Sequence, residues 1–212
     1  MQKFERSHIM KAKEIRHEAL IRLEGNWIAM IGMTILVTVL SAVLGSVYIL
    51  IAPLLLPGAA LFTLKVIRQN KPDIGDLFGT YKNYLNALVA IVLQGLIIIA
   101  GCFLFIIPGI IFAYMFSLVP FIIADDAKQN LSAVDILKES ARLMKGYKWK
   151  LFCLYFSFIG WILLCVITFG IAVIWISPYM AASHAVFYDK IKEADEKKAI
   201  GNDNTGFENT AL

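Results

Sequence analysis

Three long stretches without a charged residue constrain this chain more than any other feature. They span residues 25–64, 83–124 and 151–188. One helix needs about 20 apolar residues to cross a bilayer, so each stretch is long enough for two helices with almost nothing left for a turn. A charge at the bilayer centre costs about 2.5–3.5 kcal/mol on insertion scales, which argues against loops as the origin of these stretches. The sequence therefore predicts three helical hairpins.

The predicted fold is all-α: a polytopic membrane protein with six transmembrane helices paired as three hairpins. The composition agrees, because 59% of the residues are hydrophobic and only 17% are charged. A soluble globular domain is closer to half apolar and a quarter charged. The predicted membrane domain covers residues 27–189, with hairpins at about 27–66, 83–124 and 150–189.

The basic residues predict the orientation of these hairpins. All 20 Lys and Arg fall in four segments, 1–24, 65–82, 125–150 and the tail after residue 188. A chain that crosses and returns three times places all four segments on one side of the membrane. Because Lys and Arg concentrate in cytoplasmic loops, we expect that side, and both termini, to be cytoplasmic.

The charged segments are expected to form amphipathic interfacial helices on the cytoplasmic side. We predict an N-terminal helix over residues 1–26, with its apolar side in the acyl boundary, and linker helices at about 73–82 and 131–146. Residues 190–212 are polar and are predicted to be disordered.

Two local signals mark the ends of the second linker helix. Ser132 with Asp135 resembles a capping box, and Gly146 fits the residue just past a helix C-terminus.

Basic residues on these helices have two interpretations. They could dock a partner protein or anionic lipid, or they could be structural, covering the inner ends of the bundle and setting the depth of the hairpins. The candidate docking residues are Arg16, Arg22, Lys138, Arg142 and Lys145.

Polar residues inside the predicted spans are the candidates for intramembrane contacts: Gln94, Tyr179, Ser183 and His184. His184 is explained by an interhelical hydrogen bond, with proton relay or ligand contact as the alternative. Gln94 either pairs within the packed helices or lines a central polar cavity. The predicted spans contain no Asp, Glu, Lys or Arg, which pumps and proton-coupled transporters usually place there.

Proline and glycine mark possible hairpin tips or kinks. The candidates are Pro57, Gly58, Pro108, Gly109, Gly170 and Pro178. The pair Pro108-Gly109 lies slightly past the midpoint of its uncharged stretch. It is interpreted as the outer tip of the second hairpin or as the first turn of the returning helix, where proline costs little.

No motif for soluble-enzyme chemistry is visible in the sequence. There is no phosphate loop, zinc motif or nucleophile elbow, and the three cysteines are not spaced as a metal or redox pair. We therefore predict no catalytic, cofactor-binding or metal-binding residues, and a protein that is not an enzyme.

Several short stretches carry a family resemblance that covers nearly the whole chain before the tail. They are "DLF" (76–78), "IIPGII" (106–111), "ESARLMKGYKWKLF" (139–152), "SFIGW" (157–161), "SPY" (177–179) and "VFY" (186–188). Together they resemble the domain-of-unknown-function family 975, integral membrane proteins found mainly in Gram-positive Firmicute bacteria. The resemblance implies a multi-pass protein of the bacterial plasma membrane with about six spans. It supplies no catalytic residues.

These observations predict a non-enzymatic membrane protein of the bacterial cell envelope, with an accessory or regulatory role through helix, lipid or partner contacts. One alternative is a small channel or transporter for a lipid, peptide or neutral solute. A further alternative is protection against membrane-active peptides. The expected partners are membrane lipids and another membrane or cytoplasmic protein, and not nucleic acid.

Overall fold

The computed structural model describes residues 12–44, 48–68, 73, 75, 84–104, 106–125, 131–168, 170 and 172–208. Within these ranges, the side chains of residues 44, 48–54, 84, 102–104, 106–108 and 198–208 are not described. Most of the predicted linker helix at 73–82 lies outside the described residues.

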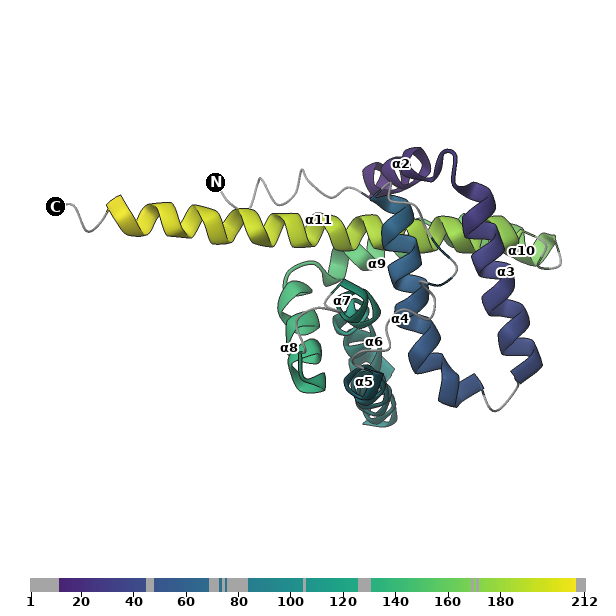
Figure 1. Ribbon diagram of the computed structural model, residues 1–212, viewed down its shortest axis with the longest axis horizontal. Helices are drawn as coiled ribbons and strands as arrows, with labels where there is room; N and C mark the ends of the chain where they lie inside the picture. The colour runs from purple at the N-terminus through teal and green to yellow at the C-terminus, as the bar shows by residue number, and fades with distance from the viewer. Residues whose placement is uncertain are drawn as a thin grey trace.

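Every regular element in the described part of the chain is a helix, so the all-α prediction is confirmed (Figure 1). The helices are α2 (Ala12–Leu23), α3 (Trp27–Leu44), α4 (Tyr48–Ile67), α5 (Tyr84–Leu104), α6 (Ile106–Met115), α7 (Val119–Asp125), α8 (Ala133–Leu143), α9 (Lys148–Phe156), α10 (Ile159–Ile167) and α11 (Val173–Glu208).

The second uncharged stretch folds back on itself between α5 and α6. Pro108 and Gly109 fall within the first turn of α6, the returning helix, which is one of the two positions predicted for them. The two helices approach closely at Gly101. A Cβ atom there would lie 2.7 Å from the ring of Phe112 and 3.2 Å from the Cα atom of Gly109. Glycine is therefore what allows the backbones of α5 and α6 to meet.

Three other glycines reverse the chain direction between helices. Gly25, Gly146 and Gly170 have φ angles of 84°, 88° and 88°, in the left-handed region that side chains rarely adopt. Gly146 follows α8 as predicted, and Gly170 lies in the turn before α11. The start of α8 differs in detail: Ser132 is its N-cap residue, but its side chain makes no capping hydrogen bond.

Pro57 and Gly58, predicted as a hairpin tip or a kink, do not lie at a tip. Both residues are buried in the middle of α4, and the connection from α3 to α4 falls at residues 45–47, outside the described residues. A long apolar stretch carries no charge to mark its turn, so the sequence alone does not distinguish a tip from a kink at this proline. Pro178 likewise lies inside a helix, near the start of α11.

Helix α2 buries its apolar stripe against protein instead of lipid. Ile15, Ala19 and Leu23 are fully buried, and α2 packs mainly on α11 and also on α4 and α9. The predicted placement of this stripe in the acyl boundary is therefore wrong, because a neighbouring helix provides the apolar surface that the stripe requires.

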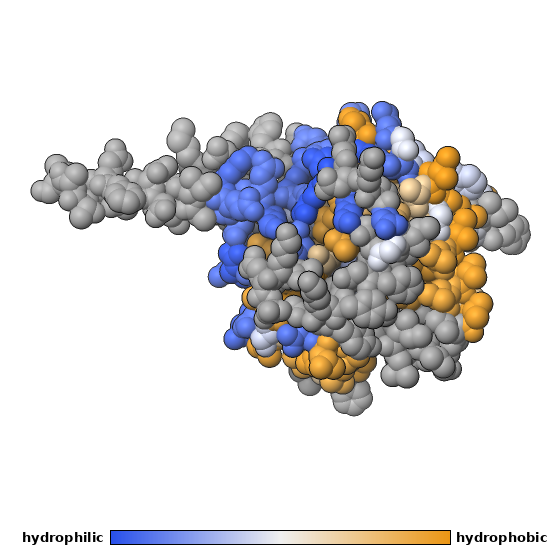
Figure 2. All heavy atoms as spheres, in the orientation of Figure 1, coloured by the Kyte–Doolittle hydropathy of each residue, from blue (hydrophilic) through white to orange (hydrophobic). Residues whose placement is uncertain are grey.

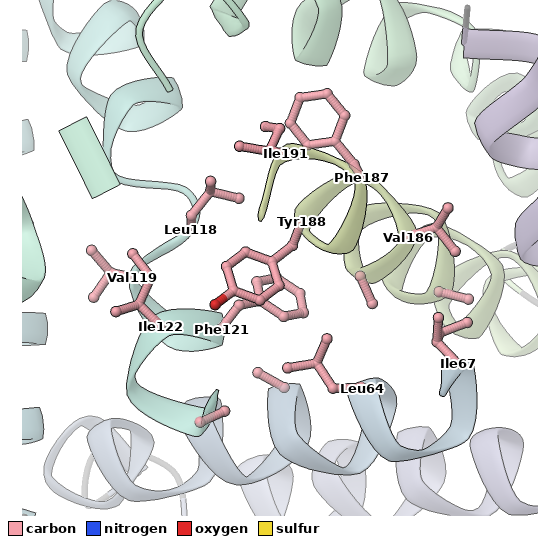
Figure 3. Packing of buried hydrophobic residues seen from close by; sticks show 14 of the residues in the cluster. Leu64, Ile67, Leu118, Val119, Phe121, Ile122, Val186, Phe187, Tyr188 and Ile191 are labelled. Atoms are coloured by element: carbon pink, nitrogen blue, oxygen red, sulfur yellow. The ribbon is translucent and has the colours of Figure 1, made fainter. Parts of the chain in front are cut away.

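The buried centre of the molecule lies where α4, α7 and α11 meet (Figure 3). Leu64 and Ile67 come from α4, Phe121 comes from α7, and Phe187 and Tyr188 come from α11. Each is at most 7% exposed. The uncharged stretches thus pack together just before their charged ends, and this packing positions the charges described below.

The tail prediction is wrong for its first part. Helix α11 is 36 residues long, about 54 Å at 1.5 Å per residue, and it continues through residues 190–208. Ile191 is only 1% exposed, and Lys197 pairs with Glu193 one turn earlier. A polar composition indicated disorder, but tertiary contacts and pairs spaced four residues apart favour the helix.

One described helix is long and apolar enough to cross a membrane, the segment Lys148–Ile167 formed by α9 and α10. A second would be α2 with α3, if that pair, bent by 99°, were a single broken span. Helices α3 and α4 run across α11 instead of alongside it (Figure 1). The arrangement of six spans therefore stays a prediction.

The contact between α5 and α6 can be tested by adding a single methyl group. We expect Gly101→Ala to lower the free energy of unfolding by about 1–3 kcal/mol, because the new Cβ collides with Phe112 and with the backbone at Gly109. Gly95→Ala in the same helix is the matched control, since a Cβ there has nothing within 4 Å. It should be neutral or stabilising by up to about 1 kcal/mol. Thermal unfolding in detergent compares the two, and equal losses would contradict the close approach.

Candidate functional site

The charged residues that follow the uncharged stretches converge on a network of ion pairs. Arg68 directly follows α4, Asp125 ends α7, and Asp189 lies on α11. Arg68 Nη1 donates to Asp125 Oδ1 at 2.7 Å, and Arg68 Nη2 donates to Asp189 Oδ1 at 2.7 Å. A planar guanidinium can hold two carboxylates in fixed directions, so Arg68 joins three helices at one point.

More groups extend this network around Asp125. Lys192 pairs with Asp125, and the Tyr188 hydroxyl donates to Asp125 Oδ2 at 3.2 Å. Burial alone would raise the pKa of the Asp125 carboxyl, but hydrogen bonds from Arg68 and Lys192 outweigh it and hold that pKa at about 2, below its ordinary value of 3.8.

Helix α2 joins the same network from the other side of α11. Arg22 lies 3.7 Å from Asp189 and also pairs with Glu18, and Glu18 in turn pairs with Lys190. The network therefore ties α2, α4 and α7 to α11.

A cleft of about 520 Å³ adjoins this network, between α7, α8 and α11. It is lined by Ile122, Asp125, Leu131, Asp135, Lys138, Glu139, Arg142, Leu143, Tyr188, Lys192, Asp195 and Glu196. Its volume is in the range typical of sites for small molecules or for a few side chains of a partner.

Arg142 bridges this cleft from α8 to α11. Its guanidinium donates to Asp195 at 3.0 Å and 2.8 Å, and to Glu139 on its own helix at 2.8 Å and 2.7 Å. The Arg142 side chain is 55% exposed, so water and salt weaken this bridge.

The predicted docking residues have different environments. Arg16 Nη1 donates to the carbonyl of Ser157, where α9 gives way to α10, and its guanidinium lies 5.6 Å from the centre of the Phe158 ring. Arg22 and Arg142 are held in the ion pairs described above. Lys138 and Lys145 are exposed on or just after α8. The structure therefore brings Lys138 and Arg142 together at the cleft, whereas Arg16 is half-buried against α9 and α10.

Three of the four predicted intramembrane polar residues, Tyr179, Ser183 and His184, lie close together on α11, and Gln94 lies on α5. His184 Nδ1 lies 3.2 Å from the Tyr155 hydroxyl, and its ring packs on Phe121. Its Nε2 is buried without a hydrogen-bond partner among the described residues. The Ser183 hydroxyl donates to the carbonyl of Tyr179 at 2.8 Å. Gln94 is half-buried on α5, and the lining of the cleft includes neither Gln94 nor His184.

Hydroxyl groups on α3 bond to their own helix, as their spacing allows. Thr34, Thr38 and Ser41 donate to carbonyls three or four residues earlier, at 2.7–2.9 Å. Within the described ranges, no three His, Cys, Asp or Glu side chains are grouped so that they could hold a metal ion.

Sequence reasoning missed the ion-pair network, although a signal for it exists. Asp125 and Asp189 are the first charges after the second and third uncharged stretches, and Arg68 follows shortly after the first. The position of these charges at the ends of three uncharged stretches of similar length is the signal that they could meet.

The fold and the ion-pair network together define the class: an all-helical protein with at least one described helix apolar enough to cross a membrane, and with ion pairs that join α2, α4 and α7 to α11. Residues 97–195, just under half of the chain, match the family described as protein of unknown function (DUF975). No curated protein and no solved structure matches the chain. The matched region contains both carboxylates that Arg68 holds and every lining residue of the cleft except Glu196.

The network makes stability depend on acid in a defined direction. Because the folded-state pKa of Asp125 is lowered, its stabilising contribution is complete above pH about 4 and is lost as the pH falls towards 2. We expect Asp125→Asn to lower the free energy of unfolding at pH 7 by about 1–3 kcal/mol, since Arg68 and Lys192 lose a charged acceptor.

The difference between Asp125→Asn and the unsubstituted protein should shrink between pH 4 and pH 2 in chemical denaturation. Glu14→Gln, at an exposed position of α2, is the control and should change stability by less than about 0.5 kcal/mol. A loss for Asp125→Asn that is constant with pH would show that the carboxylate charge is not what stabilises the fold.

Proposed function

We propose that this chain is an integral membrane protein of the bacterial cell envelope, without catalytic activity, that acts as an accessory or regulatory protein through lipid and partner contacts. The observation that supports membrane integration is the amount of apolar surface left exposed. Helix α10 has no buried residue, and Val166 is 70% exposed. Ile28 and Val43 on α3 are 89% and 77% exposed, and Leu85 on α5 is 74% exposed.

Apolar exposure of this extent favours a lipid environment. Burying one large aliphatic side chain is worth about 1.5–3 kcal/mol in water, and monomeric soluble proteins rarely leave extended apolar patches. Figure 2 shows hydrophobic atoms gathered over α3, whereas hydrophilic atoms gather around α2, α8 and the middle of α11. Lipid against the first surface and water against the second accounts for this separation.

The accessory role is favoured over transport by what surrounds the polar residues. His184 packs among aromatic rings, and the hydroxyls of α3 are bonded to their own helix. The cleft opens among charged helices and includes neither Gln94 nor His184 in its lining. Proteoliposomes that move ions or labelled lipid at a rate above protein-free vesicles would favour the transport alternative instead.

The multi-pass arrangement with cytoplasmic termini is part of this proposal. We expect the protein to resist extraction by alkaline carbonate. A fluorescent-protein reporter fused after Leu212 should be fluorescent, as in the cytoplasm, and an alkaline phosphatase reporter inserted at Gly170 should be active outside. Release of the protein by carbonate, or an external C-terminus, would contradict the proposal.

One introduced arginine should affect membrane insertion when it is placed in the lipid-facing segment and not when it is placed in the interfacial helix α8. Ile159 lies near the middle of the segment Lys148–Ile167 and is 51% exposed. We expect Ile159→Arg to disfavour membrane insertion by about 3 kcal/mol and to reduce the carbonate-resistant fraction. Val134→Arg on α8, at a side chain that is 47% exposed, is the matched control and should leave that fraction unchanged. Equal fractions for both variants would place Ile159 outside the lipid.

A further inference from the structure

The cleft between α7, α8 and α11 has more acidic than basic groups. Its lining contains five carboxylates and three basic side chains, an excess of two negative charges. Two of the basic groups are already paired with carboxylates of the cleft: Lys192 with Asp125, and Arg142 with Glu139 and Asp195. Exposed Asp135 and Glu196 therefore lie at the cleft beyond these pairs.

The same cleft also presents apolar surface. Leu131 is half-buried and is the most accessible apolar side chain of the lining, whereas Ile122, Leu143 and Tyr188 form its buried floor at no more than 7% exposure each. A ligand that fits both parts carries cationic groups beside apolar ones. The acidic excess disfavours anionic lipid headgroups and free phosphate, which carry the same sign of charge as the surplus.

The location of the cleft indicates where such a ligand would come from. The cleft lies beside the ion-pair network, on the side of the molecule that the proposed function places in the cytoplasm. Other membrane proteins concentrate Lys and Arg on that side, directly beside their apolar helices. From these observations, and resting on the proposed function, we propose that the cleft binds a basic amphipathic juxtamembrane segment of a partner membrane protein.

The bridge from Arg142 to Asp195 gives this binding a defined competitor. Arg142 supplies from within the chain the cation that a partner would supply from outside. Because the bridge is exposed and screened, an incoming Lys or Arg can replace it at Asp195 at little cost. Lys138, on the same face of α8, adds a positive charge that such a partner must tolerate.

The test uses the full chain in a neutral detergent and a fluorescein-labelled twelve-residue peptide of alternating Lys and Leu pairs, monitored by fluorescence anisotropy. We expect saturable binding that weakens about tenfold in the double variant Asp135→Asn, Glu196→Gln. The matched control is Glu14→Gln with Glu24→Gln, which removes the same charge from exposed positions outside the cleft and should change the affinity less than twofold.

A third variant should change the peptide affinity in the opposite direction. A misfolded protein would not bind the peptide more tightly. Arg142→Gln removes the internal competitor, so we expect the peptide to bind several-fold more tightly. Equal weakening in both double variants would reduce the effect to general charge attraction and overturn the proposal. The proposal would also be overturned if the unsubstituted chain did not bind the peptide, or if a peptide with Glu in place of Lys bound equally well.

The test of the cleft and the test of membrane location can fail independently of each other. Vesicles with anionic phospholipid serve as a second probe. If Arg142→Gln and Lys138→Gln weaken vesicle binding while the peptide does not bind, the cleft is a lipid site and the partner proposal is wrong. Carbonate extraction scores the membrane location independently. Failure of peptide binding in a protein that resists extraction therefore overturns only the partner class.

Discussion

The arrangement of the helices depends on one guanidinium group that holds two carboxylates. Arg68 connects the end of α4 with the end of α7 and the middle of α11. Apolar side chains of the same three helices form the buried centre immediately beside it. Hydrophobic packing is non-directional and leaves helices free to slide along one another, whereas a two-sided ion pair fixes their relative heights. Two walls of the cleft, α7 and α11, are held in this way, and Arg142 joins the third wall, α8, to α11.

Much of the helical framework could be predicted from the absence of charge. Long charge-free stretches predicted helices, and the position of Pro108 and Gly109 in the first turn of α6 followed from counting residues within one stretch. Counting is less informative where no charge marks the break, so for Pro57 it left a hairpin tip and a kink as alternatives, of which the structure excludes the tip. Composition also predicted the wrong structure for residues 190–208, because the polar composition of this segment does not reveal its ion pairs with α2, α7 and α8.

The candidate site was predictable only in part. Lys138 and Arg142 were recognised as basic residues on an amphipathic helix, but their acidic partner Asp195 lies in a segment predicted to be disordered. Arg16 illustrates the converse, since a basic residue expected to face a partner donates instead to the carbonyl of Ser157. A single sequence gives the sign and spacing of charges along one helix. Which charges meet across helices depends on packing, and that information is not local.

Helix α11 gives the molecule a mechanical property. It is one continuous rod of about 54 Å that packs along its middle against α2, α4 and α8 and extends beyond them (Figure 1). A rod held in this way acts as a lever: a tilt of about 5° around Asp189 moves the C-terminal end of the helix, about 28 Å away, by about 2.5 Å. Any change in the charges around Asp189 or Asp195 would therefore be amplified at the far end of the helix, well away from the place where the change occurs.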